Sequence, residues 1–380
     1  VRVTDDWDRR LVQTYMRQFI CEDAIAVENF PLCDLPDYHV PQEGDLKSYK
    51  DFIKNLPQTD HPAAFGQHPN ADISSQIEDT VGLLGTIISL QPKVIIEGAE
   101  TPMQKLAKQV TSMKPQVPKV FNVRQVRKDM AARSDPDALK TVLFQEVDRY
   151  NVLLARLSKA MSDMEKATLG LVIVTPALEA AMDSLLEFSV PSTWHVAYPS
   201  TKGLASWMRD LIQRVAQMSN WISKELPKTF WLSGFTYPTG FLTALLQTTA
   251  RKNGIAIDTL SWEFPILTQS AEDIQTGAKE GAYITGMFLE GARWDKSGAC
   301  LSEPLPMELT SPMPIVHFKP SDGKKKAAKN AYACPIYMYP VRTGSRERPS
   351  YVTTVDLKAG NNSSEFWIKR GVALLLSTSS

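Results

Sequence analysis

The chain has 380 residues, more than one typical hydrophobic core holds, so we expect two or three domains. Its 42 Lys and Arg balance its 42 Asp and Glu, which excludes a global field that would attract nucleic acid or an anionic membrane. The longest apolar runs, 169–174 and 372–376, are far too short to span a bilayer. The first residues show neither an initiator methionine nor a signal peptide, so the chain is expected to be part of a larger protein.

The first 90 residues alternate helical patterns with proline-rich loops. Thr4 or Asp5 can cap the first helix with a side-chain oxygen. The last helix of this part carries an apolar stripe with spacings of 4, 3 and 4 residues. Helices are expected over 1–30, 46–54 and 74–90, the last with its stripe at Ile77, Val81, Leu84 and Ile88.

Residues 91–137 are basic and rich in proline, which predicts short helices joined by turns. The clearest helix follows, with an apolar seam from Leu143 to Met164 whose charged neighbours, Glu146 among them, are expected on other faces. A homo-oligomeric coiled coil uses such a seam, but the apolar run 169–174 directly after it favours packing inside a domain.

Two further helices are expected over 176–188 and 203–225, and then a stretch that divides the chain. Residues 230–232 predict a short strand or turn, and Pro238 suits the first position of a helix because its missing N–H needs no partner there. Asn253 and Gly254 favour a left-handed helix end.

Beyond Gly254 the pattern becomes β. Six apolar and β-branched runs, separated by Gly, Pro, Ser, Asn and Lys, indicate an antiparallel sheet that closes on itself or a small sandwich. The expected fold class is α+β, with helical parts followed by a C-terminal antiparallel β-barrel or sandwich. The six runs are 255–267, 282–290, 314–319, 333–341, 351–357 and 366–376.

No motif for catalysis or cofactor binding is present in the sequence. It lacks the phosphate-binding G-x-x-x-x-G-K-[ST], as well as G-x-G-x-x-G, G-x-S-x-G and H-E-x-x-H, so no catalytic or cofactor-binding residue is predicted. The four scattered cysteines have no C-x-x-C spacing and are expected to be free thiols. A metal site built from histidines and cysteines matches no zinc pattern and is not predicted; the residues considered are His39, His61, His68, Cys21 and Cys33.

A basic segment, 319–348, is the remaining candidate for recognition. Lys324, Lys325, Lys326 and Lys329 can contact an acidic partner, whereas stacking aromatics for nucleic acid are lacking. The alternative is a solvated loop that keeps a sheet edge from pairing with other chains.

Several non-generic segments occur in the order found in axonemal dynein heavy chains, and the chain resembles the C-terminal region of that family along nearly its whole length. The residue choices at 194–200 and TARKN look more like its outer-arm β type. The segments are VTDDWDRR (3–10), FGQHPNAD (65–72, with Gln67 where leucine is usual), FWLSGF (230–235), GFLTALLQTTARKNG (240–254), FLEGARWD (288–295), PMP (312–314), YACP (332–335) and IKRGVALLL (368–376).

The resemblance implies three parts: the helical lid of the sixth AAA+ module (1–75), a helical bundle (76–254) and a β-barrel cap (255–380). It implies an ATP-driven, minus-end-directed microtubule motor that bends cilia and flagella, located in cytoplasm, cytoskeleton and axoneme. ATP, Mg²⁺ and microtubules bind elsewhere in the parent protein, so this part is expected to brace the AAA+ ring without hydrolysing ATP. Its partners are the rest of the ring and other dynein heavy, intermediate and light chains; no nucleic acid and no membrane are expected.

Two alternatives stay open. Arg9 or Arg10 can sense a nucleotide, as arginines of AAA+ lids do, or can form a structural ion pair with Asp5 or Asp6. The polypeptide can also act as a partner-binding module that recruits an accessory dynein subunit or an acidic tail through 319–348.

Overall fold

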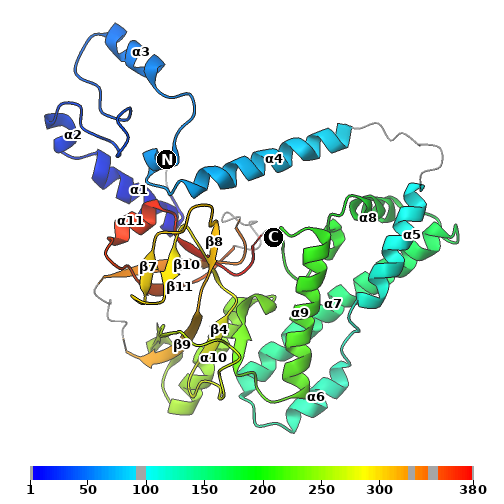
Figure 1. Ribbon diagram of the computed structural model, residues 1–380. Helices are drawn as coiled ribbons and strands as arrows, with labels where there is room; N and C mark the ends of the chain where they lie inside the picture. Colours follow the sequence, from blue (N-terminus) through cyan, green and yellow to red (C-terminus); the bar gives the residue numbers. More distant parts are fainter. Residues whose placement is uncertain (1–2, 91–99, 324–329, 341–349, 379–380) are drawn as a thin grey trace.

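A computed structural model describes residues 3–90, 100–323, 330–340 and 350–378. An N-terminal group of helices leads through one long helix to a helical bundle, and a β-rich part follows (Figure 1). The predicted α+β class is confirmed. No helix of the described part is long and apolar enough to cross a membrane.

The N-terminal part has almost no core of its own. Asp5 caps α1, accepting hydrogen bonds from the backbone N–H groups of Trp7 (2.9 Å) and Asp8 (3.0 Å), as predicted. Within the described residues 3–69, only Thr14 is buried. Its elements are α1 (Asp6–Phe19), α2 (Asp23–Ala26), α3 (Leu46–Asn55) and the 3₁₀ turn Pro62–Phe65.

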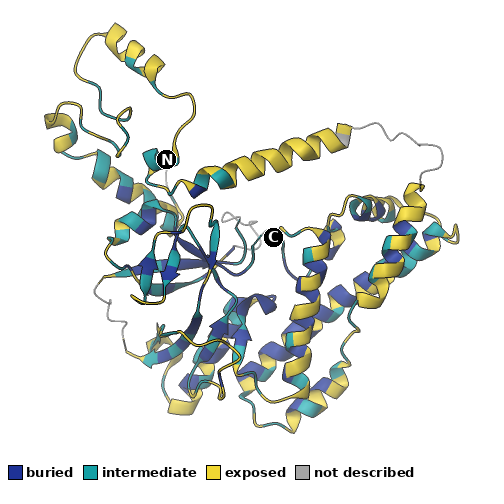
Figure 2. Cartoon of the chain, viewed as in Figure 1, coloured by how far each residue is buried: buried dark blue, intermediate teal, exposed yellow. Residues whose placement is uncertain are grey.

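Helix α4 (Asn70–Leu90) is exposed along most of its length (Figure 2). The helix is predicted correctly, but its apolar stripe packs on no described part of the chain. We call Ile77, Val81, Leu84 and Ile88 the α4 stripe; their exposed fractions are 49%, 64%, 51% and 64%. Apolar residues on the other faces, such as Leu83 and Ile87, are exposed as well. The C-terminal half of α4, 81–90, carries no charged residue, and a helical segment that is apolar on several faces is normally buried.

The bundle is built around α7 (Asp137–Thr168), whose predicted seam is buried from Leu143 to Met164. The seam packs inside the domain, as predicted. One expectation for this part is wrong, because Glu146 is fully buried instead of lying on an outer face. The apolar run that follows the seam is partly exposed, with Leu171 and Ile173 at 69% and 91%. The other helices are α5 (Pro102–Met113), α6 (Val123–Ala131), α8 (Pro176–Leu186), α9 (Leu204–Ser223) and α10 (Pro238–Asn253).

The β-rich part has two five-stranded sheets and a hairpin, β6–β7, among the described residues. The first sheet has the order β1-β4-β9-β2 with β3 also on β9, and the second has the order β11-β10-β12-β5-β8. The strands are β1 (Thr229–Trp231), β2 (Leu260–Glu263), β3 (Ile266–Leu267), β4 (Ala282–Thr285), β5 (Phe288–Glu290), β6 (Arg293–Asp295), β7 (Cys300–Ser302), β8 (Thr310–Pro312), β9 (Ile315–Asp322), β10 (Ala331–Tyr337), β11 (Tyr351–Lys358) and β12 (Ala373–Leu375), with helix α11 (Ser364–Lys369) before β12.

The sheets depart from the prediction in two ways. The strands of the described residues form no closed barrel, so the barrel is not confirmed. The sheets are not purely antiparallel either, because β1 pairs with β4 and β10 with β12 in parallel. Strand β1 precedes the expected boundary at 254 and yet belongs to a sheet of the β-rich part. The expected boundaries at 75 and 254 stay predictions.

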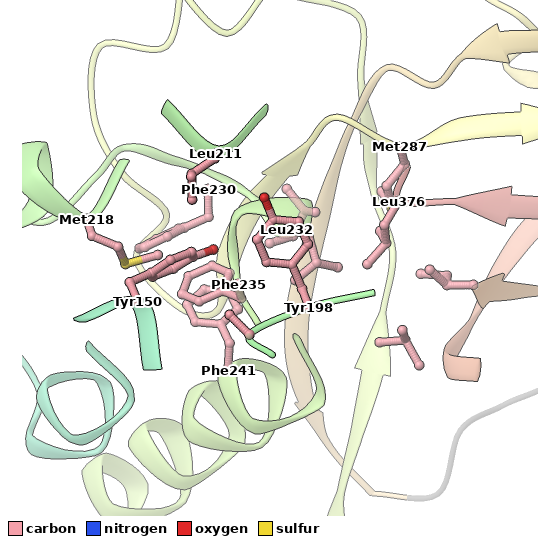
Figure 3. Close-up of a cluster of buried hydrophobic side chains, with 14 of the residues drawn as sticks. Tyr150, Tyr198, Leu211, Met218, Phe230, Leu232, Phe235, Phe241, Met287 and Leu376 are labelled. Carbon is pink, nitrogen blue, oxygen red and sulfur yellow. The ribbon is translucent and has the colours of Figure 1, made fainter. Parts of the chain in front are cut away.

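The stretch 230–254 forms the junction between the bundle and the sheets, as its local pattern predicts. It supplies β1, a 3₁₀ turn (Leu232–Gly234) and α10, which starts at Pro238 and ends at Gly254 with φ +65°. Phe235 stacks on Phe241 with ring centroids 4.3 Å apart, and Phe230 packs at a tilt against both rings, at 4.8 Å from Phe241 and 6.3 Å from Phe235. Figure 3 shows these rings between bundle residues such as Met218 and residues of the β-rich part such as Leu376. One apolar core therefore crosses the junction.

Candidate functional site

Arg10 fastens α1 to the second sheet. Its guanidinium donates hydrogen bonds to the carbonyl oxygen of Ala333 (2.7 Å) and to the Tyr332 hydroxyl (3.2 Å), and it lies 4.4 Å from the centroid of the Trp7 ring. The Tyr332 hydroxyl donates in turn to the carbonyl oxygen of Val372 (2.6 Å). The guanidinium also lies 5.2 Å from the centroid of the Tyr332 ring. Charge-assisted hydrogen bonds and this cation–π contact thus join the N-terminal helix to β10 and, through Tyr332, to the segment before β12.

The two arginines considered as nucleotide sensors both make structural contacts. Arg9 forms the expected ion pair with Asp6 (3.0 Å) on the surface, while Asp5 serves as the helix cap. Arg10 pairs with neither aspartate, and its partners lie more than 320 residues away in the sequence. No local sequence pattern predicts the contact of Arg10 with β10.

Asn70 makes the second attachment. This buried side chain, at the start of α4, accepts a hydrogen bond from the backbone N–H of Met307 (2.9 Å). Its amide donates to the carbonyl oxygens of Leu305 (2.8 Å) and Glu308 (3.0 Å). One side chain therefore holds the whole turn between β7 and β8, in which Met307 has a φ of +65°. Alanine cannot replace these bonds, because the amide supplies both donors and the acceptor.

A third attachment surrounds α11. Lys369 donates a hydrogen bond to the side-chain oxygen of Gln18 on α1 (2.9 Å). Gly66, with φ +71°, lies so close to Lys369 that an added Cβ would approach its Cβ to 2.9 Å. Tight packing therefore accompanies the hydrogen bond. We call the contacts of Arg10, Asn70 and Lys369 together the lid clamp.

A cavity of about 350 Å³ lies beside the lid clamp. His68 lines it, and burial lowers the pKa of this histidine, with the charge of Arg370 lowering it further. Arg370 itself forms an ion pair with Glu303 (3.0 Å). His68 is therefore neutral at pH 7, and its Nδ1 accepts a hydrogen bond from the backbone N–H of Asn70 (3.2 Å).

The candidate residues of the basic segment cannot be placed. Lys324, Lys325, Lys326 and Lys329 lie outside the described residues. Lys319, at the start of that segment, forms an ion pair with Glu263 (3.1 Å) on the neighbouring strand β2. Within the described part of the chain, no group of three His, Cys, Asp or Glu is arranged to hold a metal ion.

A buried carboxylate holds the junction from the bundle side. Glu146 on α7 accepts hydrogen bonds from the backbone N–H groups of Thr236 (2.6 Å) and Tyr237 (3.2 Å) and from the Thr236 hydroxyl (3.0 Å). Arg149 pairs with it at 3.0 Å. Burial raises the pKa of the Glu146 carboxyl, and these donors offset part of that rise. The N-terminus of α10 is thus capped by a side chain from another helix.

A second buried group secures the same turn. Arg214 on α9 pairs with Asp210 (2.6 Å) and donates to the carbonyl oxygen of Ser233. The Tyr150 hydroxyl donates to the carbonyl oxygen of Gly234 (2.8 Å). The Ser233 hydroxyl reaches the carbonyl oxygen of Leu376, just after β12. The polar groups of the turn 232–236 are therefore shared among α7, α9 and the C-terminal segment.

Comparison with known proteins shows the family to which the chain belongs. The family model for the C-terminal domain of dynein heavy chains matches residues 77–376, and the model for their AAA lid domain matches residues 1–71. The chain belongs to the dynein heavy chain family. Residues 1–71 accordingly correspond to the lid, and residues 77–376 to the C-terminal domain.

The relatives are axonemal. The chain is 49% identical over 379 residues to the dynein-1-beta heavy chain, flagellar inner arm I1 complex, of Chlamydomonas reinhardtii, covering 99% of this chain and 8% of that protein. It is 44% and 43% identical to dynein axonemal heavy chain 2 of Mus musculus and Homo sapiens, covering 100% of this chain and 8% and 9% of those proteins. The chain thus spans less than a tenth of these relatives. The outer-arm β type is not confirmed.

Proposed function

We propose that this chain is the C-terminal end of an axonemal dynein heavy chain, a minus-end-directed microtubule motor that drives ciliary and flagellar beating in the axoneme. Its role is to brace the AAA+ ring: the lid of the sixth module and the C-terminal domain move as one body, so the bundle restrains or transmits rearrangements of the ring. Nucleotide hydrolysis belongs to other parts of the heavy chain, as does microtubule binding, and this part holds no nucleotide of its own.

The lid clamp is the observation that carries this proposal. Within the described residues 3–69 the lid buries only Thr14, and the side chains of Arg10, Asn70 and Lys369 fix it to the C-terminal domain. The three hydrogen bonds of Asn70 and the two hydrogen bonds of Arg10 hold the lid in one orientation, which a lid that rotates freely about a linker would not show. The uncovered α4 stripe agrees with a location inside a larger assembly, where neighbouring modules cover it.

The test is made in the complete heavy chain, with Arg10→Ala and Asn70→Ala combined. We expect a changed stall force or run length on microtubules, with ATP binding at the first ring module unaltered. Arg9→Ala is the matched control, because Arg9 on the same helix contacts only sequence neighbours, in a surface ion pair with Asp6 and a hydrogen bond to the carbonyl oxygen of Val3. Motility of the double variant equal to that of the control refutes the bracing role.

The absence of a nucleotide site in this part has its own test. The thermal melt of the 380-residue chain should not move on addition of Mg-ATP or Mg-ADP. A ligand at a hundred times its Kd adds about 2.7 kcal/mol to the free energy of unfolding, which is easily detected. A clear rise in Tm contradicts this part of the proposal. Recruitment of an accessory subunit through 319–348 stays a second proposal, tested by charge reversal at Lys324, Lys325 and Lys326 in a pull-down.

A further inference from the structure

Although the chain carries no net charge, its basic and acidic residues are unevenly distributed along the sequence. Residues 101–128 contain seven Lys and Arg and no Asp or Glu, whereas residues 1–80 contain fifteen Asp and Glu against seven Lys and Arg. A basic stretch of this length in a neutral protein creates a local positive field. We call its cations the α5–α6 ridge; they are Lys105, Lys108, Lys114, Lys119, Arg124, Arg127 and Lys128.

The ridge lies on a rigid support. Helices α5 and α6 both pack on α7 through buried residues such as Leu106 and Met130, and Figure 1 shows them along the outer side of the bundle. Between the two helices, Phe121 exchanges two hydrogen bonds with the side chain of Asn151 on α7, at 2.7 and 3.0 Å. The backbone that carries the cations is therefore fixed, while all seven side chains are exposed.

The charges at the α6 end of the ridge are not neutralised by the described part of the chain. At the α5 end, Lys108 pairs with Glu100 and Lys114 with Glu165. Lys119, Arg124 and Lys128 form no ion pair with a described residue, and Arg127 lies over the ring of Phe144 at 5.2 Å. These charges are free to meet an external anion, and because they are solvated, meeting one requires little desolvation.

We propose that the α5–α6 ridge binds an acidic polypeptide segment of a partner protein. Charge complementarity is the basis: the exposed cations at the α6 end, which form no ion pair with a described residue, repel basic segments and attract acidic ones. Nucleic acid fits less well, because Phe121 is the only aromatic residue of the ridge stretch and it packs on the core, so no stacking platform faces outward. The inference does not depend on the bracing role.

The test measures binding of a labelled poly-glutamate peptide to the 380-residue chain by fluorescence anisotropy. The variant combines Lys119→Glu, Arg124→Glu and Lys128→Glu. The variant replaces three exposed ion pairs of ordinary strength with repulsion between like charges. We therefore expect binding of the peptide to be roughly ten- to hundredfold weaker. Binding of the unaltered chain should also weaken steeply with salt, since exposed charges are screened within about 8–10 Å at 0.1–0.15 M.

A matched control separates the ridge from total charge. The triple change Lys228→Glu, Lys279→Glu and Lys296→Glu alters net charge equally at exposed lysines without a described ion pair, and it should leave Kd unchanged. Glutamine at the three ridge positions should give an intermediate loss, and thermal melts verify that each variant is folded.

Three outcomes overturn the proposal. The first is equal weakening by the ridge and control variants, which assigns the binding to total charge. The second is tighter binding of a single-stranded oligonucleotide than of poly-glutamate at the same salt concentration. The third is salt-sensitive self-association of the chain, measured by sedimentation and abolished by the ridge variant, without binding of the peptide. That result makes the acidic lid of a second copy the occupant.

Discussion

The carboxylate of Glu146 gives the sharpest test of how the junction is held. In Glu146→Ala, the buried backbone N–H groups of Thr236 and Tyr237 lose their acceptor, and Arg149 loses its partner. An unsatisfied buried donor costs about 1–3 kcal/mol, while removal of the buried charge returns part of its desolvation penalty. We therefore expect a loss of about 2–4 kcal/mol in the free energy of unfolding.

The assay is a thermal melt of the 380-residue chain. At about 2–4 °C per kcal/mol for a domain of roughly 150–250 residues, the loss corresponds to a Tm lower by about 4–16 °C. Gln145→Ala is the matched control, because this neighbour of Glu146 on α7 is exposed and such surface changes stay within about 0.5 kcal/mol. Equal Tm values for the two variants refute the capping of α10 by Glu146.

Three more predictions concern the sheets, acid stability and the uncovered helix. Gly281→Ala should lower Tm far more than Gly254→Ala. Both glycines have positive φ, but a Cβ at Gly281 would lie 1.8 Å from a backbone oxygen, whereas the space at Gly254 is open. Similar losses of Tm would contradict the packing of β4 on β9. Burial lowers the pKa of both His68 and His195 below 6.5, so the unfolded chain binds protons more readily than the folded chain. The free energy of unfolding should therefore fall as the pH drops below about 6.5. A Tm that is constant between about pH 7.5 and 5.5 is the contrary result. Serine at all positions of the α4 stripe should reduce self-association in sedimentation without lowering Tm, and a lowered Tm shows that the stripe packs on this chain after all.

Local rules were sufficient for the elements that depend on neighbouring residues. The seam of α7 follows from apolar spacing alone. The start of α10 at Pro238 and its end at Gly254 follow from backbone preferences that any fold must respect. The strand β1 was also expected, but its parallel pairing with β4, more than 50 residues later, was not.

The contacts that fix the parts to one another could not be predicted, because their partners are remote in the sequence. Glu146 lies next to the apolar seam on the helix surface, and a charged residue there is expected in water. Its burial depends on backbone N–H groups 90 and 91 residues later. The same holds for Asn70, whose partners are main-chain atoms of a distant turn, and for Arg10, which contacts a main-chain oxygen and a tyrosine hydroxyl of a distant strand. Every residue carries a backbone carbonyl, so the sequence does not show which of them accepts a hydrogen bond from a distant side chain.

The exposure of the apolar run after α7 and of the α4 stripe has a different cause. Hydropathy predicts that such residues are covered, and it cannot say whether the cover belongs to the same chain. Ile173 and the α4 stripe are exposed in the described part of this chain, which spans less than a tenth of its relatives. Both surfaces fit a piece whose neighbours belong to the rest of the heavy chain.

Amide hydrogen exchange at the lid clamp tests most directly whether the lid and the C-terminal domain form one body. The N–H of Met307 donates to Asn70 and should be protected in the unaltered chain. In the combined variant Arg10→Ala and Asn70→Ala we expect that protection to vanish and the amides of α1 to lose protection with it, because the described residues 3–69 have almost no core of their own. Unchanged protection of α1 would mean that the lid holds its place without the contacts of Arg10 and Asn70, and the bracing role would lose its structural basis.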